Sequence, residues 1–184
     1  METTKGLIIP NTGDYPLFYK RYVELASGKA LKALSDNQET FIKKLYGSLS
    51  TDQGILSYSE GKWSFNELLG HIIDTEKLMH FRALSISRGE KSNLPGFDQE
   101  VYVANADFNN QTPEKLLSTF LMHRELLWHF IEAIPVIQCG NIGTVSSNPM
   151  SLSALIYIIF GHMEHHLGII KKNYLPVIGL TDPL

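Results

Sequence analysis

Apolar residues recur every three or four positions in four long stretches of the chain, which is the spacing of amphipathic helices rather than of strands. These stretches span about residues 29–49, 64–88, 112–134 and 151–174, and a shorter helix is expected over residues 16–26. In the first stretch the repeating apolar positions are Leu31, Leu34, Phe41, Leu45 and Leu49. The pattern therefore predicts an all-α fold, a four-helix bundle preceded by a short helix.

Capping signals support two of these boundaries. Ser64 followed by Glu67 forms the pattern of a capping box, and Gly89 can take the left-handed conformation that ends a helix. Thr112 followed by Pro113 is a hydroxyl cap with a proline at the first helical position. The second helix should therefore run from Ser64 to about residue 88, and the third should begin at residue 112.

The link between the second and third helices is too long for a simple antiparallel turn. It spans residues 90–111, which is enough chain to cross the length of the bundle and leave these two helices parallel. We expect an up-down-down-up order of the four helices. Long connections of this kind often cover a functional site, and this one carries the segment LPGFD at residues 94–98.

Length and charge narrow the class of protein. The chain has 184 residues, 43% of them apolar, which suits a single domain over residues 1–184, with the bundle core at about 15–175 and short extensions at both ends. The net charge is −3 and the pI near 6.1, and Lys and Arg are scattered, so nucleic-acid binding is not expected.

Nothing in the sequence indicates export or a membrane. The first five residues do not resemble the start of a signal peptide, and the longest apolar run, residues 154–160, falls short of the roughly 20 residues that a membrane span needs. The single cysteine, Cys139, lies in a Gly-rich loop at residues 139–143 and cannot form an internal disulfide. We expect a cytoplasmic protein in which this thiol is unreactive.

Two histidines interrupt the apolar face of the last helix. Its inward positions read Leu152, Leu155, Ile159, His162, His166 and Ile169. Residues four apart on a helix project side by side, the separation at which two imidazoles can bind one metal ion.

The second helix adds a third inward histidine. Its inward positions read Leu68, His71, Thr75 and Leu78. We therefore expect His71, His162 and His166 to meet inside the bundle and hold a divalent ion. The alternative is that they are core histidines with ordinary hydrogen-bond partners, which would require a separate solution for each buried ring.

The remaining polar candidates have several interpretations. His165 is expected at the rim of the site, although an exchange of ligand role with His166 stays open, and Asp74 could orient an imidazole or lie in solvent. Arg82 and Arg124 could bind a substrate anion or form buried structural ion pairs. The other histidines are expected to be surface or packing residues: His80, His123 and His129.

Several motifs resemble the DinB-like (YfiT-like) superfamily of metal-binding four-helix bundles. They are GKWS at residues 61–64, LGHIIDTE at 69–76, RAL at 82–84, LPGFDQ at 94–99 and GHMEHHL at 161–167. The resemblance covers roughly residues 15–175 and implies a bundle with a crossover between helices two and three. It also implies a mononuclear zinc or nickel site made by one histidine of the second helix and a His-x-x-x-His pair of the last, here His71, His162 and His166. Members are frequently homodimers.

The resemblance leaves the reaction open. Characterised relatives include low-molecular-weight thiol transferases and a thiol-dependent isomerase, and others are named metal-dependent hydrolases. Three imidazoles leave an open position on the ion, where either a thiol or a water could be activated for attack on a small-molecule substrate. Family grounds favour transfer of a low-molecular-weight thiol, with hydrolysis, a non-catalytic metal-binding stress-response bundle or a plain helical scaffold as alternatives.

No catalytic residue beyond the ligands can be assigned from the sequence. The candidates for a general base are Asp74, Glu76, Glu164 and His165, and none is favoured by its spacing.

Overall fold

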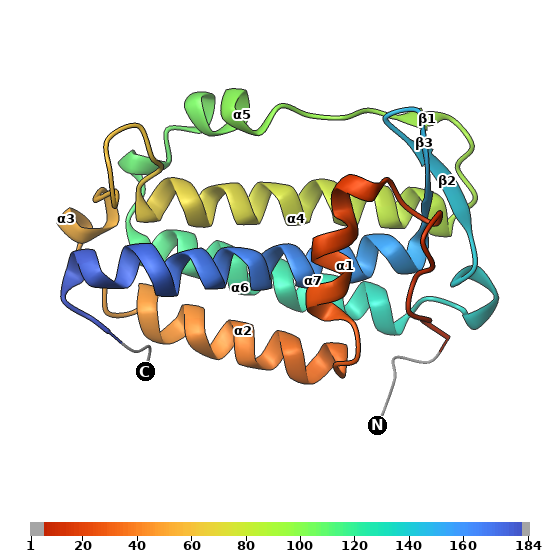
Figure 1. Cartoon of the computed structure of the whole chain (residues 1–184), viewed down its shortest axis with the longest axis horizontal. Coiled ribbons are helices and arrows are strands. Elements are labelled where there is room, and N and C mark those ends of the chain that lie inside the picture. The colour runs from red at the N-terminus through yellow and green to blue at the C-terminus, as the bar shows by residue number, and fades with distance from the viewer. Residues whose placement is uncertain (1–5, 182–184) are drawn as a thin grey trace.

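The computed structural model describes residues 6–181; residues 1–5 and 182–184, which belong to the expected terminal extensions and include the segment considered for a signal peptide, lie outside the described residues. Four long helices pack side by side along the molecule (Figure 1). They are α2 (Leu31–Tyr46), α4 (Phe65–Ser87), α6 (Pro113–Glu132) and α7 (Leu152–Ile169). The all-α bundle expected from the periodicity is confirmed.

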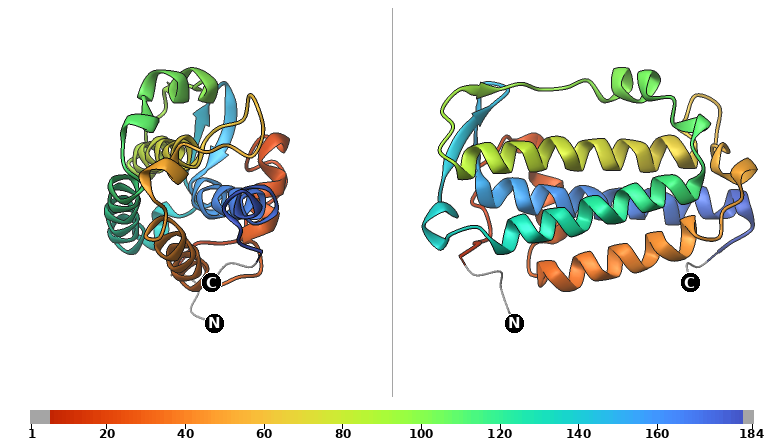
Figure 2. Two further views of the ribbon diagram at one scale, coloured as in Figure 1. Left: turned by 90° about the vertical axis from the view of Figure 1, so that its left-hand side faces the viewer. Right: turned by 180° about the vertical axis from the view of Figure 1, so that it is seen from behind.

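The helices follow the expected order of directions. α4 and α6 run the same way, whereas α2 and α7 run the opposite way (Figures 1 and 2). The crossover between α4 and α6 passes along the outside of the bundle and contains its own short elements. These are strand β1 (Asn93–Leu94), helix α5 (Gln99–Ala106) and the 3-10 turn η2 (Phe108–Asn110).

A small sheet closes one end of the bundle, and the sequence pattern did not predict it. Strands β2 (Ile142–Val145) and β3 (Asn148–Ser151) form a hairpin, and β1 pairs with β2 in parallel, so the order is β1-β2-β3. Part of the stretch expected to be a Gly-rich loop is therefore strand β2. The sheet ties the start of the crossover to the segment that leads into α7.

Side-chain caps set the helix starts. The Ser64 hydroxyl accepts a hydrogen bond from the Glu67 backbone N–H, and the Glu67 carboxylate accepts one from the Ser64 N–H, which confirms the predicted capping box. The Thr112 hydroxyl caps α6 in the same way, through the N–H of Lys115. A four-residue helix, α3 (Thr51–Gly54), has a capping box of its own and is too short to be read from periodicity.

A short helix crosses the bundle in contact with α7. The 3-10 turn η1 (Leu17–Tyr19) leads into α1 (Lys20–Ala26), which lies across the middle of α7 (Figure 1). The approach is close because residue 161 is glycine: a Cβ there would lie 1.7 Å from the carbonyl oxygen of Tyr22. This contact places the aromatic residues of the first segment directly over the following residue, His162.

α7 is the central helix of the molecule. Its residues from Leu152 to Met163 are all buried, because α1, α2 and α4 all pack against it. Beyond Ile169 the chain enters a π-helical turn, η4 (Ile170–Tyr174), which buries Ile170, so the expected inward residue Ile169 is only half buried. A final 3-10 turn, η5 (Leu175–Ile178), follows. No described helix combines the length and apolar character required to cross a membrane.

Candidate metal centre

Helices α4 and α7 bring three imidazoles into contact inside the bundle. The Nε2 atom of His162 lies 3.2 Å from Nε2 of His71 and 3.0 Å from Nε2 of His166. Each of the three residues offers a nitrogen within 4.8 Å of the other two, and all three side chains are buried. The residues that the sequence singled out are thus together in the structure.

The spacing of these nitrogens fits a shared ion better than hydrogen bonds. Ligands about 2.0–2.1 Å from a tetrahedral zinc ion lie roughly 3.3 Å apart, close to the observed separations. A ring nitrogen has one proton or one lone pair, so Nε2 of His162 can satisfy only one of its two neighbours by a hydrogen bond. A cation placed among the three nitrogens would satisfy all of them.

Burial keeps these rings in the form that binds metal. Desolvation lowers the pKa of His71 from 6.5 to about 4. Burial, followed by the neighbouring imidazoles, holds the pKa of His162 and His166 well below the ordinary value. At neutral pH the three rings are therefore uncharged, and each has a lone pair available to an ion.

Aromatic rings pack against the imidazoles, two of which lack a hydrogen bond at Nδ1 within residues 6–181. The Nδ1 atoms of His162 and His166 are buried and have no hydrogen-bond partner among the described residues. Tyr22 of α1 packs edge-on against His162 with ring centroids 5.3 Å apart, and Trp63 lies against His71 at 4.6 Å. Trp63 is itself fixed, because the Tyr174 hydroxyl donates a 2.7 Å hydrogen bond to its carbonyl oxygen.

A cleft of about 250 Å³ opens beside His71 and His162. Its walls are the inward face of α4, the aromatic residues of η1 and α1, and Gly96, Phe97 and Gln99 of the crossover, so the crossover does cover the site as its length suggested. No aspartate or glutamate is among the described residues that line it. A smaller cleft of about 210 Å³ reaches His166 from the side of Trp63 and Tyr174.

Asp74 and His165, the two candidates for supporting roles, differ in how close they lie to the three imidazoles. Asp74 pairs with Lys77 at 3.3 Å near the surface and does not orient an imidazole. His165 is half buried, with its ring 5.4 Å from that of Tyr22 and 5.1 Å from that of His166. It therefore borders the centre, as expected for a rim residue.

The other histidines have packing or surface positions, as expected. His80 lies 5.4 Å from His123 and 4.8 Å from Phe130, measured between ring centroids, at a distance from the triad along α4. His129 is exposed and lies 4.0 Å from Glu125. Burial raises the pKa of the Cys139 thiol, in line with an unreactive cysteine.

The two arginines that the sequence left open differ in their surroundings. Arg124 is fully buried in an ion pair with Glu76, whereas Arg82 lines the cleft beside the imidazoles. The contributions of Tyr22 and Trp63 to the site were not predicted from the sequence. Trp63 precedes the α4 cap within the GKWS motif, but the contact of Tyr22 with His162 depends on how α1 crosses α7, which periodicity does not encode.

The buried histidines predict a specific acid sensitivity of the metal-free protein. His71 and His123 have pKa values of about 4 in the folded protein against 6.5 for an ordinary histidine, mainly because they are desolvated. The unfolded chain therefore takes up protons first as the pH falls, and protonation favours unfolding. Stability should be fully present above pH 6.5, should decline as the pH falls towards 4, and should lose nothing further from these groups below that.

Melting temperatures between pH 8 and pH 4 in the presence of a chelator test this expectation. His123→Gln should reduce the decline, whereas His129→Gln, at an exposed position, should leave it unchanged. A melting temperature that stays constant from pH 6.5 to 4.5 would contradict the prediction.

Comparison with known proteins agrees with this picture. The family model of the DinB superfamily matches residues 29–170, which include all three histidines. A protein of Oceanobacillus iheyensis named "Putative metal-dependent hydrolase" is 26% identical over 148 residues, covering 72% of this chain and 79% of the relative.

A solved structure shares the fold. YfiT from Bacillus subtilis, described as "a probable metal-dependent hydrolase with an unusual four-helix bundle topology", matches with a TM-score of 0.71. The match covers 92% of this chain and 93% of YfiT at 12% sequence identity, so it supports the architecture alone. Because the family model spans residues 29–170, well over half of the chain, the protein belongs to the DinB superfamily.

Proposed function

We propose that the protein is a metal-dependent enzyme whose single divalent ion is bound by His71, His162 and His166. The observation that carries this proposal is the convergence of three neutral Nε2 atoms, 3.0 and 3.2 Å apart, beside an open cleft. Three imidazoles leave a coordination position free, as in catalytic rather than structural sites. Nitrogen ligands suit zinc and nickel alike.

The reaction that we propose is transfer of a low-molecular-weight thiol to an electrophilic small molecule. When bound, the ion would lower the pKa of a thiol that reaches it and so supply the nucleophile. No described carboxylate lines the larger cleft, whereas Glu100 lines the smaller one beside His166. The lack of a described carboxylate in the larger cleft supports thiol transfer there, because thiol activation by a metal needs less help from a general base. Tyr19, Tyr22 and Phe97 line the cleft and would exclude water from the reactants.

Hydrolysis by the same centre is the second candidate. Its support is that both relatives described above are named metal-dependent hydrolases. Water would then take the place of the thiol as the group activated by the ion, and the cleft would hold an ester, amide or related substrate.

One set of assays separates these candidates. Zinc-loaded, nickel-loaded and metal-free protein is given cysteine, glutathione or coenzyme A together with 1-chloro-2,4-dinitrobenzene, and in parallel p-nitrophenyl acetate alone. We expect thiol conjugation at least about tenfold faster with the metal-loaded than with the metal-free protein, since the metal supplies the activation. His162→Ala should abolish the difference.

The other outcomes are equally informative. Metal-dependent ester cleavage without conjugation would favour the hydrolase. Stoichiometric metal binding with neither activity would indicate a non-enzymatic metal-binding bundle, and protein that binds no metal would contradict both candidates.

A further inference from the structure

Arg82 is a buried cation with no counter-ion in the part of the chain that the structure describes. Its side chain is 3% exposed, and its guanidinium donates hydrogen bonds to the carbonyl oxygen of Pro95 at 2.6 Å and to the sulfur of Met79 at 3.4 Å. No carboxylate of the described residues lies within 4.0 Å of it. A buried charge is costly unless it is paired, so this arrangement requires an explanation.

The second buried arginine of the bundle shows that the fold can provide a partner. Arg124 binds the Glu76 carboxylate through both Nε and Nη2. It also donates to Ser35 and Gln38 at 3.1 and 3.0 Å. Arg82 also has a side-chain hydrogen bond, with Tyr19, but it has no anionic partner among the described residues, and the space next to it is the cleft.

The same face of α4 carries Arg82 and a ligand of the proposed metal centre. His71, Thr75 and Arg82 follow one another at steps of four and seven residues, so they share the side of the helix that lines the cleft. The helical rise places the Cα atoms of His71 and Arg82 about 16 Å apart. Because side chains on a helix lean towards its N-terminus, the guanidinium is directed back along the cleft towards the imidazoles.

A second polar group in the cleft lacks a partner. Thr75 lies between His71 and Arg82, is 4% exposed, and its hydroxyl has no hydrogen-bond partner among the described residues. The ring of Phe97, from the crossover, packs over the Arg82 guanidinium at 5.7 Å. The cleft therefore combines one cation, one free hydroxyl and aromatic walls, and no described acidic residue lines it.

We propose that the cleft binds a small organic carboxylate with an apolar or aromatic body. Arg82 binds the carboxylate group of this ligand, and Thr75 contacts the ligand between that group and the imidazoles. This ligand is one reactant of the proposed enzyme, so the inference rests on the proposed function and specifies its substrate class. The planar guanidinium fork matches a carboxylate in two parallel hydrogen bonds. The volume of about 250 Å³ suits a molecule of roughly ten non-hydrogen atoms and leaves its other end facing the imidazoles.

Calorimetric titration of the zinc-loaded protein with 3-phenylpropionate tests the proposal. Its amide, 3-phenylpropionamide, has the same shape without the charge and should bind at least about tenfold more weakly. Arg82→Gln should weaken carboxylate binding by a similar factor and leave amide binding unchanged. Arg88→Gln is the matched control, because Arg88 lies exposed at the end of the same helix and bonds to Gln138.

The inference is overturned if the amide binds as tightly as the carboxylate, or if Arg82→Gln binds the carboxylate like the wild-type protein. Preferential binding of inorganic phosphate over 3-phenylpropionate would also overturn it. Should Arg82→Gln fail to fold, Arg82→Lys and Thr75→Val give the same readout, each with an expected severalfold weaker binding of the carboxylate but not of the amide.

Repeating the titration with metal-free protein separates this inference from the proposed function. Arg82 is not a ligand, so its preference for the carboxylate over the amide should persist without the ion. If the protein binds no metal and still shows this Arg82-dependent preference, the metal proposal alone fails. If metal is bound and the preference is missing, the substrate class alone is wrong.

Discussion

Replacing Arg124 with methionine is expected to lower the free energy of unfolding by about 3–5 kcal/mol. The substitution would leave Glu76, which is 1% exposed, as a buried carboxylate without its partner. Burial raises the pKa of Glu76 and Arg124 lowers it. Without Arg124 the folded variant contains either an unpaired buried carboxylate or a protonated one, and both reduce the free energy of unfolding. Urea denaturation followed by circular dichroism measures the loss.

Two further variants show whether the loss arises from the buried pair. Lys20→Met removes a cation from the exposed Lys20–Glu24 pair, whose atoms lie 3.7 Å apart, and should cost about 1 kcal/mol or less. Adding Glu76→Leu to Arg124→Met should restore much of the stability, because both charges are then absent. A loss below about 1 kcal/mol in the single variant would show that Glu76 is not held by Arg124.

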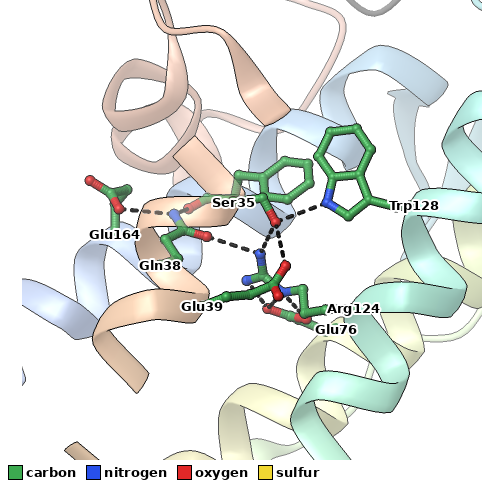
Figure 3. Close-up of polar contacts among 8 residues, drawn as sticks. Ser35, Gln38, Glu39, Glu76, Arg124, Trp128 and Glu164 are labelled. Carbon is green, nitrogen blue, oxygen red and sulfur yellow. Dashed lines mark hydrogen bonds and ion pairs between the residues drawn. The ribbon is translucent and has the colours of Figure 1, made fainter. Parts of the chain in front are cut away.

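This ion pair belongs to a polar network that reaches all four long helices (Figure 3). Arg124 of α6 joins Glu76 of α4 to Ser35 and Gln38 of α2. The Gln38 amide nitrogen then donates to the carbonyl oxygen of Phe160 in α7, at 2.9 Å, two residues before His162. The network therefore fixes how the helices that carry the imidazoles lie against the rest of the bundle.

Removing His162 is expected to reduce metal affinity at least about a hundredfold, because its Nε2 is the nitrogen nearest to both other imidazoles. His162→Ala should keep its helical content, since the buried Nδ1 of this ring has no hydrogen-bond partner in residues 6–181. Metal content after dialysis, measured by inductively coupled plasma mass spectrometry beside far-ultraviolet circular dichroism, gives both quantities.

Two neighbouring histidines provide the comparison. His129→Ala, at the surface, should bind metal like the wild-type protein. His165→Ala distinguishes a rim residue from a ligand, and we expect it to retain at least about a tenth of the wild-type affinity, as for changes around rather than at the ligands. Full metal stoichiometry in His162→Ala would show that the ion is bound at another site.

The features that the sequence predicted depend on local rules. Helix starts could be placed because Ser64 and Thr112 carry their own capping groups, and the periodicity placed His71, His162 and His166 on inward faces. Inward residues on two helices that face one another in a bundle come close together, and this can be predicted without knowing the packing in detail.

The features that the sequence missed depend on contacts between distant segments or on unusual turns. The β2–β3 hairpin turns through Ser146 and Ser147 with φ values of 48° and 63°, a conformation usually signalled by glycine or asparagine. Pro149 also argued against a strand and is accommodated because β3 lies at the edge of the sheet. Arg82 lies six residues from Glu76 on the same helix and so cannot pair with it, but only the assembled bundle shows that Arg124 of α6 does.

The π-helical turn η4 that follows α7 has a consequence for how the pocket beside His71 can vary. Tyr174 is the last residue of η4, and its hydroxyl donates a hydrogen bond to the backbone carbonyl of Trp63. The indole of Trp63 packs against the ring of His71. The family match ends at residue 170, before this tyrosine. The nitrogen donors and Trp63 thus lie within the matched stretch, whereas the tyrosine that anchors the Trp63 backbone lies beyond it, so a change of this anchor could alter the pocket beside His71 without altering the donors.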